Sequence, residues 1–292
     1  MGTPSTSYYE IYSGLAFGEA SHSEGIGTVA EGKGSHSEGW GTIAIGDYSH
    51  AEGNVSFAKG LSSHAEGFLN VASGDYSHAE GYKTNASAKG AHTEGLETVA
   101  SEEGAHSEGI SAQATGKGAH AEGKNTIAQG AYSHVEGGVY GDATNLAKGE
   151  SSHVEGGGCT AEGQYSHAGG ILSTATSSAS FASGWGVRSS HLQGSAAFGR
   201  WNRRYDDLDN IAPIFAIGDG TGESDREEEP EHRSDALRVW PRTDAGPGGL
   251  EVTGNVTVGN NLRIKGSNGK YYKLVIDDSG AISAVLDEPS NT

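Results

Sequence analysis

The chain has 292 residues, a formal net charge of -19, and 48 glycines against 6 prolines. Glycine does not occupy every third position, which excludes a collagen triple helix. The acidic balance argues against nucleic acid or an anionic membrane surface as a partner. Cys159 is the single cysteine, so an intrachain disulfide is excluded and stability must come from packing or assembly.

Residues 1–13 form a short polar segment that ends in aromatic residues. We expect this segment to cap the following structure or to attach the chain to a larger assembly, because the end of a repeat array exposes unpaired edge groups. It lacks a basic region followed by an apolar run, so we expect no signal peptide. No apolar stretch approaches the ~18 residues that a membrane span needs, and no membrane insertion is predicted.

Residues 14–199 repeat the phrase Ser/Ala-His-x-Glu-Gly, whose first nine histidines follow one another at a constant step of 14 residues. A second phrase, such as Ile43-Ala44-Ile45-Gly46, recurs at the same step. A unit this short cannot hold two helices, whereas one coil of a β-solenoid needs only two short strands and two glycine turns. The sequence therefore predicts an all-β solenoid. The repeated pairs are His22 and Glu24, His36 and Glu38, His50 and Glu52, His64 and Glu66, His78 and Glu80, His92 and Glu94, His106 and Glu108, His120 and Glu122, and His134 and Glu136.

The alternation of side chains along a strand sets which residues face the coil interior. It directs Ser23 and Ala30 inward, and it directs His22, Glu24 and Val29 outward. A core of alanine and serine buries little apolar surface, at about 25 cal/mol per Å². We therefore expect the outward apolar residues to be covered by sister chains in an obligate homotrimer. These outward residues are Val29, Ile43, Phe57, Val71, Val99 and Ile127.

The 14-residue step, the phrases Ile43-Ala44-Ile45-Gly46 and Ala197-Phe198-Gly199, and the Gly-x-x-Ser spacing resemble the head repeats of YadA-like trimeric adhesins. This resemblance implies a left-handed parallel β-roll with one repeat per coil and three rolls per trimer. The Ser-His-x-Glu-Gly variant also resembles repeats in bacteriophage tail-fibre and tail-spike proteins. Both families use the roll as a rigid stalk or head.

Residues 200–292 change in composition and predict a small β-rich C-terminal domain. The expected strands are 214–218, 236–240, 250–253, 255–258, 261–264, 271–276 and 281–286, with a hairpin turn at 277–280. The segment 218–221 followed by 233–239 resembles the end segment of many phage tail-fibre and tail-spike chains. An acidic loop, 223–233, separates these two stretches.

The repeated His and Glu residues are expected to form a structural ladder of hydrogen bonds. Both residue types are also metal ligands, so cation binding is the alternative interpretation. We predict no metal and no cofactor. We also predict no catalytic residue, because nine like copies in one row indicate architecture rather than one strained site. Carboxylates at Asp206, Asp207, Asp209 and 227–231 leave a polysaccharide-degrading activity open.

Aromatic and arginine residues near the end of the roll are the candidate receptor-binding set, because aromatic faces stack on sugars. The set comprises Trp185, Arg188, Trp201, Arg203, Tyr205 and Trp240. The alternative is that these side chains form the core of the C-terminal domain.

Taken together, these features predict a non-enzymatic, trimeric structural fibre of a phage tail or phage-like particle that attaches to a host surface. The expected partners are other tail or baseplate proteins and a host surface glycan or protein, and the expected location is the virion. One alternative is the head of a bacterial trimeric adhesin at the cell surface. A second alternative is a polysaccharide-degrading tail spike.

Overall fold

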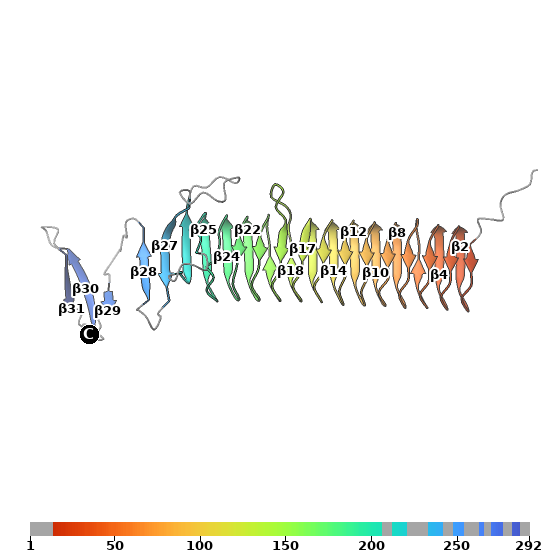
Figure 1. Ribbon diagram of the computed structural model, residues 1–292, viewed down its shortest axis with the longest axis horizontal. Coiled ribbons are helices and arrows are strands. Elements are labelled where there is room, and N and C mark those ends of the chain that lie inside the picture. Colours follow the sequence, from red (N-terminus) through yellow and green to blue (C-terminus); the bar gives the residue numbers. More distant parts are fainter. Residues whose placement is uncertain are drawn as a thin grey trace, which may run out of the picture. The chain divides into compact units, whose positions relative to one another are not determined.

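The computed structural model describes residues 14–205, 212–220, 233–241, 248–253, 263–265, 270–276 and 282–286. The chain divides into two compact units, Met1–Glu251 and Val252–Thr292. The first unit is a parallel β-solenoid of about 13 turns with coils of about 14 residues (Figure 1). The predictions of an all-β fold and of a short repeating coil are confirmed.

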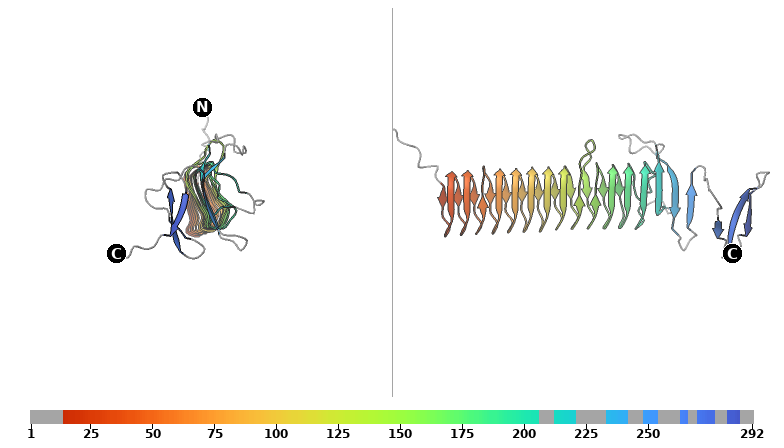
Figure 2. Two further views of the ribbon diagram at one scale, coloured as in Figure 1. Left: turned by 90° about the vertical axis from the view of Figure 1, so that its left-hand side faces the viewer. Right: turned by 180° about the vertical axis from the view of Figure 1, so that it is seen from behind.

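The strands build two sheets on opposite sides of a flat coil (Figure 2). We call them the long-strand sheet, most of whose strands in the repeats have five residues, and the short-strand sheet, whose strands have two or three. The long-strand sheet contains β2 (His22–Ile26), β4 (His36–Trp40), β6 (His50–Ala51), β8 (His64–Phe68), β10 (His78–Tyr82), β12 (His92–Leu96), β14 (His106–Ile110), β16 (His120–Lys124), β18 (His134–Val135), β20 (His153–Val154), β22 (His167–Ile171), β24 (Phe181–Trp185), β25 (Ala196–Arg200), β26 (Phe215–Asp219), β27 (Asp235–Trp240) and β28 (Gly249–Val252). The short-strand sheet contains β1 (Leu15–Ala16), β3 (Val29–Ala30), β5 (Ile43–Ala44), β7 (Phe57–Ala58), β9 (Val71–Ala72), β11 (Asn85–Ala86), β13 (Val99–Ala100), β15 (Gln113–Ala114), β17 (Thr126–Ala128), β19 (Asn145–Ala147), β21 (Thr160–Ala161) and β23 (Thr174–Ala175).

Pairing between coils is parallel and in register, so each residue lies beside its own copy in the next coil. His78 pairs with His64 on one side and with His92 on the other. In the short-strand sheet, Ala86 pairs with Ala72 and Ala100 in the same way. The sequence period is therefore the structural period.

The coil interior is filled by small side chains, as the alternation predicts. Ala30, Ala44 and Ala65 are fully buried, and so are their equivalents in the coils that follow the first. Buried hydroxyl groups satisfy the turns: Ser49 Oγ donates a hydrogen bond to the Gly46 carbonyl at 2.6 Å. Because a hydrogen-bonded hydroxyl costs less to bury than an unpaired one, serine fits this narrow interior.

Asparagine replaces the small interior residue in several coils and bonds to the backbone of the next coil. Asn145 Nδ2 donates to the carbonyl oxygens of Glu136 and Gly156, each at 2.8 Å. Its Oδ1 accepts from the Cys159 N–H at 2.8 Å. The side chain thus ties two coils together beside the insertion loop, 138–144, which projects from the solenoid after β18 (Figure 1).

The parallel stack ends near residue 220. β25 and β26 still pair in parallel, but β27 pairs antiparallel with β26. The second unit is a three-stranded antiparallel sheet of β29 (Arg263–Lys265), β30 (Tyr271–Ile276) and β31 (Ile282–Leu286). The predicted strand 255–258 and the turn at 277–280 lie outside the described residues.

One glycine per coil follows the ladder glutamate and adopts a conformation that other residues avoid. Gly95 has φ of +104°, and a Cβ built on it would lie 2.2 Å from the Gly109 carbonyl oxygen. Gly104, in the same coil, has φ of +67° with nothing within 4 Å of such a Cβ. A side chain at Gly95 would meet both backbone strain and a clash with the next coil, whereas one at Gly104 would meet only the strain of the left-handed conformation.

Substituting Gly95→Ala is expected to destabilise the solenoid by at least about 3 kcal/mol, because strained φ and a backbone clash act together. Gly104→Ala is expected to cost only about 1 kcal/mol, for the left-handed conformation alone. Urea unfolding followed by circular dichroism measures both values. Equal losses in the two variants would contradict this account of the glycine.

Candidate functional site

The outer surface of the long-strand sheet carries two parallel rows, which we call the His–Glu face. A histidine opens each long strand from β2 to β22, and a glutamate follows two residues later in every coil through Glu155. From His36 to His153 adjacent rings stack, with centroids 4.6–5.0 Å apart and interplanar angles of 1–18°. The nine predicted pairs lie on this face, and the structure extends the rows beyond them to His153, Glu155 and His167.

Some glutamates contact the histidine of the following coil, and others, such as Glu108 and Glu122, contact the histidine of their own coil. His50 Nε2 lies 3.3 Å from Glu38 Oε1, and His64 Nε2 lies 3.1 Å from Glu52 Oε1. His78 Nε2 lies between two carboxylates, 3.4 Å from Glu66 Oε1 and 3.7 Å from Glu80 Oε2. An imidazole protonated at Nε2 can donate to one of these oxygens, which links neighbouring coils.

Two residues near the middle of the His–Glu face, Glu108 and His106, have shifted pKa values. Burial, hydrogen bonding to Glu122 and the nearby charges of Glu94 and Glu122 raise the pKa of Glu108. Burial, followed by repulsion from His92 and His120, lowers the pKa of His106. Both shifts favour the neutral form of the residue concerned.

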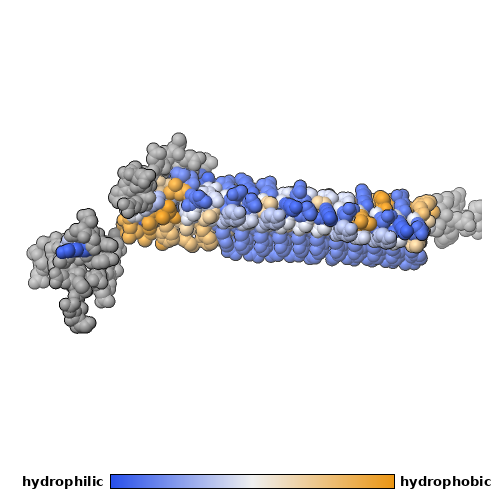
Figure 3. All heavy atoms as spheres, turned by 90° about the horizontal axis from the view of Figure 1, so that it is seen from below, coloured by the Kyte–Doolittle hydropathy of each residue, from blue (hydrophilic) through white to orange (hydrophobic). Residues whose placement is uncertain are grey.

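The His–Glu face turns apolar at the C-terminal end of the solenoid. The Phe181 ring lies beside His167 with centroids 4.7 Å apart and a tilt of 32°, and Phe198 follows Phe181 at 5.2 Å. Six half-buried or exposed residues form this region, which we call the apolar patch: Phe181, Phe198, Phe215, Ile217, Leu237 and Val239. Figure 3 shows the long hydrophilic band and its replacement by hydrophobic side chains along the lower margin.

Two of the six candidate receptor-binding residues are buried. Trp201 is 1% exposed, and the Arg233 guanidinium lies 4.8 Å from the centre of its ring. Tyr205 is 8% exposed and donates a hydrogen bond to the Asp235 carboxylate. Burial and this hydrogen bond raise the pKa of Tyr205. These contacts join residues about 30 positions apart, which no local pattern in the sequence indicates.

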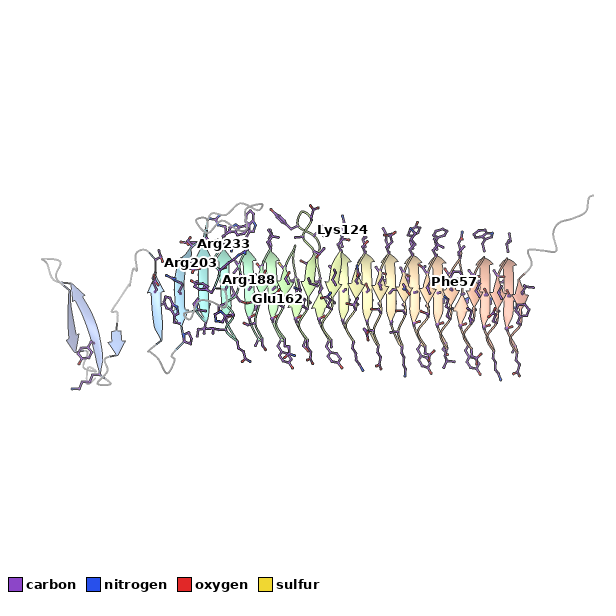
Figure 4. All side chains as sticks on the ribbon, in the orientation of Figure 1. Phe57, Lys124, Glu162, Arg188, Arg203 and Arg233 are labelled. Carbon is purple, nitrogen blue, oxygen red and sulfur yellow. The ribbon has the colours of Figure 1, made fainter. Side chains whose placement is uncertain are left out.

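The other four residues of that set reach solvent to different degrees. Trp185 is 37% exposed and Arg203 is exposed, whereas Arg188 and Trp240 are half-buried. The Arg238 guanidinium lies 5.1 Å from the centre of the Trp240 ring. Arg188, Arg203 and Arg233 come from successive layers at the end of the solenoid (Figure 4). The carboxylates Asp206, Asp207, Asp209 and 227–231 lie outside the described residues.

A further exposed apolar row escaped the sequence prediction. The fifth residues of the long strands form this corner row: Ile26, Trp40, Phe68, Tyr82, Leu96 and Ile110, which are 37–53% exposed. The available signal was a large apolar residue four positions after the repeated histidine. We call the predicted outward residues of the short strands, Val29, Ile43, Phe57, Val71, Val99 and Ile127, the short-strand row; all six are half-buried. The two rows flank the same turn of each coil.

Comparison with known proteins assigns this chain to no family, so the chain is characterised by its solenoid fold. No protein-family model matches it, and no curated protein is similar to it. In the described part of the chain, no helix is long and apolar enough to cross a membrane. The class defined by fold and surface is a parallel β-solenoid with a His–Glu face.

Glu108→Gln is expected to stabilise the protein at pH 7 in buffer free of divalent cations. A raised folded-state pKa means that the stability contributed by Glu108 is present at low pH and is lost as its carboxyl ionises. The gain in melting temperature should therefore vanish near pH 4.

Glu103→Gln is the matched control, because the Lys117 ammonium lowers the pKa of Glu103. Its stabilising contribution is present above the unfolded pKa and is lost on acidification, so this variant should melt slightly lower at pH 7. Thermal unfolding of both variants between pH 4 and pH 8 provides the measurement. The explanation fails if Glu108→Gln melts at or below the wild-type temperature at pH 7.

Proposed function

We propose that this protein is a non-enzymatic structural fibre subunit that assembles as a homotrimer in a phage tail or phage-like particle and attaches to a host surface. The observation that carries the proposal is the placement of side chains in the solenoid. Alanine and serine fill the interior, while the larger apolar residues lie outside it. Such a coil gains little from its own core and favours association.

Assembly is supported by the two apolar rows that flank one turn of each coil. The short-strand row is half-buried within one chain, and the corner row reaches 53% exposure at Trp40. Asn85 and Gln113 interrupt the short-strand row. Sister chains packed around a common axis would cover this edge along many coils, and a homotrimer with cyclic symmetry does so with closed contacts.

A role as a stalk follows from the regular stacking. About 13 coils spaced by about 4.8 Å give a rod of about 60 Å. Each coil bonds to the next through both sheets, for example from His64 N to Ser77 O and from Val71 N to Thr84 O, each at 2.9 Å. A rod of this kind holds a binding end at a fixed distance from its attachment point, which is the mechanical task of a fibre.

Attachment is proposed for the C-terminal end of the solenoid. Trp185 and Arg203 are exposed there, and the neighbouring residues Trp201 and Tyr205 hold the local structure rigid. An exposed indole and a guanidinium suit a sugar ring or an anionic surface group. The proposed ligand is therefore a host surface glycan or protein.

The assembly test compares charge insertion at two opposite turns of the coil. Wild-type protein is expected to sediment at three times the 29.9 kDa mass of one chain. Phe57→Asp with Val71→Asp should weaken assembly at least tenfold in Kd, about 1.4 kcal/mol, because the added carboxylates would be desolvated in the interface.

Tyr48→Asp with Tyr76→Asp is the matched control, because these side chains are 59% and 56% exposed at the other turn. It should leave the sedimenting mass unchanged. A folded wild-type monomer would overturn the assembly proposal.

The attachment test uses fluorescently labelled protein on bacterial cells that carry the matching phage or prophage. Trp185→Ala should reduce cell binding at least tenfold without changing the melting temperature. Trp201→Ala should instead lower the free energy of unfolding by about 3–5 kcal/mol, since it empties a buried site. Antibody labelling of purified particles should place the protein on the tail.

Three results would redirect this proposal. Labelling of the bacterial envelope rather than of particles would favour a surface adhesin. Release of oligosaccharide from host capsule by purified protein would favour a polysaccharide-degrading spike. Cell binding unaffected by Trp185→Ala would remove the proposed attachment site.

A further inference from the structure

We propose that the His–Glu face is a linear array of binding sites for divalent transition-metal ions, each site formed by one imidazole and two carboxylates from adjacent coils. The sequence by itself favoured a hydrogen-bonded ladder without metal. The proposal does not depend on the fibre function, because the ligands of each site belong to one chain.

The site geometry is clearest at His78. Its Nε2 lies 3.4 Å from Glu66 Oε1, in the preceding coil, and 3.7 Å from Glu80 Oε2, in its own coil. Two ligand atoms that share a tetrahedral Zn²⁺ at 2.0–2.2 Å lie about 3.4 Å apart. The three side chains therefore surround an ion-sized position after only a small rotation.

The stacking of the rings limits each ion to one histidine. Groups of two successive histidines and the intervening glutamate have ligand atoms within 4.8 Å of one another, as in His64, Glu66 and His78. A metal, however, lies in the plane of the imidazole that binds it. The rings of His64 and His78 are 4.8 Å apart and only 18° from parallel, so they cannot both direct a lone pair at one ion. The two nearest carboxylates complete the set instead.

Unsatisfied nitrogen atoms provide a second, independent observation. The Nε2 atoms of six ladder histidines are buried and make no hydrogen bond to the described residues. These residues are His36, His106, His120, His134, His153 and His167. A buried donor or acceptor without a partner is destabilising. Coordination through Nε2 would satisfy each atom and would favour a transition metal over Ca²⁺ or Mg²⁺, which prefer oxygen ligands.

Charge sets the expected stoichiometry. The face carries ten glutamates, from Glu24 to Glu155, and no lysine or arginine in either row of these coils. Neighbouring sites share a carboxylate, and ions in adjacent coils would lie about 4.8 Å apart and repel each other. Occupation of alternate coils assigns two glutamates to each divalent ion, so ten glutamates divided by two give five ions per chain. The side chains of His78, Glu66 and Glu80 are 34%, 36% and 44% exposed, which leaves a path for entry.

The test is equilibrium dialysis and calorimetry of the full chain with Zn²⁺, with Mg²⁺ as the comparison ion and Co²⁺ as a spectroscopic probe. Wild-type protein should bind about five Zn²⁺ per chain and develop the intense visible absorption of tetrahedral Co²⁺. Glu66→Gln with Glu80→Gln should remove one or two ions. His64→Phe should also lower the count, because alternate occupation uses His36, His64, His92, His120 and His153. A phenyl ring can take the place of the imidazole in the row, as Phe181 does 4.7 Å from His167.

Glu31→Gln with Glu102→Gln removes the same charge from outside the face and should leave the stoichiometry unchanged. Binding that is equally strong for Mg²⁺ and insensitive to His64→Phe would show simple counterion attraction and would overturn the proposal. So would the absence of Zn²⁺ binding in a wild-type protein whose circular dichroism shows a folded β-structure.

Discussion

The structure depends on one constraint: every coil must form backbone hydrogen bonds to the next at a single spacing and in register. The N–H of His64 bonds to Ser77 O at 2.9 Å, and equivalent bonds recur from coil to coil. Each residue consequently stacks on its own copy about 4.8 Å away. A residue type is suitable only if it tolerates itself as a neighbour. Alanine, serine and glycine meet this condition inside the coil, and imidazole rings meet it outside by stacking.

Glutamate meets the condition least well, and this explains the chemistry of the His–Glu face. Burial, then hydrogen bonding to Glu122 and the charges of Glu94 and Glu122, raise the pKa of Glu108. The histidines between the glutamates cannot fully compensate, because burial and neighbouring imidazoles disfavour their charged form at His106. The face is therefore suited to ligands that bring positive charge and accept both nitrogen and oxygen donors. Where the histidines end, aromatic rings continue the same stack without charge.

The thin interior has a second consequence, at the edges and at the end of the stack. Apolar side chains that the interior cannot hold form the short-strand row, the corner row and the apolar patch. The end of the parallel stack is closed differently, by the antiparallel strand β27, by Arg233 over the Trp201 ring and by the Arg203 N–H that donates to Asp235. Large residues appear inside only where the coil no longer has to repeat.

The sequence alone determined the coil length, the inward alanines and the outward His and Glu, because period and alternation translate directly into an in-register solenoid. The tertiary structure decided which groups meet across coils. The Glu38 carboxylate reaches His50 in the following coil, and Tyr205 bonds to Asp235 about 30 residues away. Such contacts depend on side-chain direction and chain return, which a linear pattern does not specify. For the same reason, the burial of Trp201 beneath Arg233 emerged only in three dimensions.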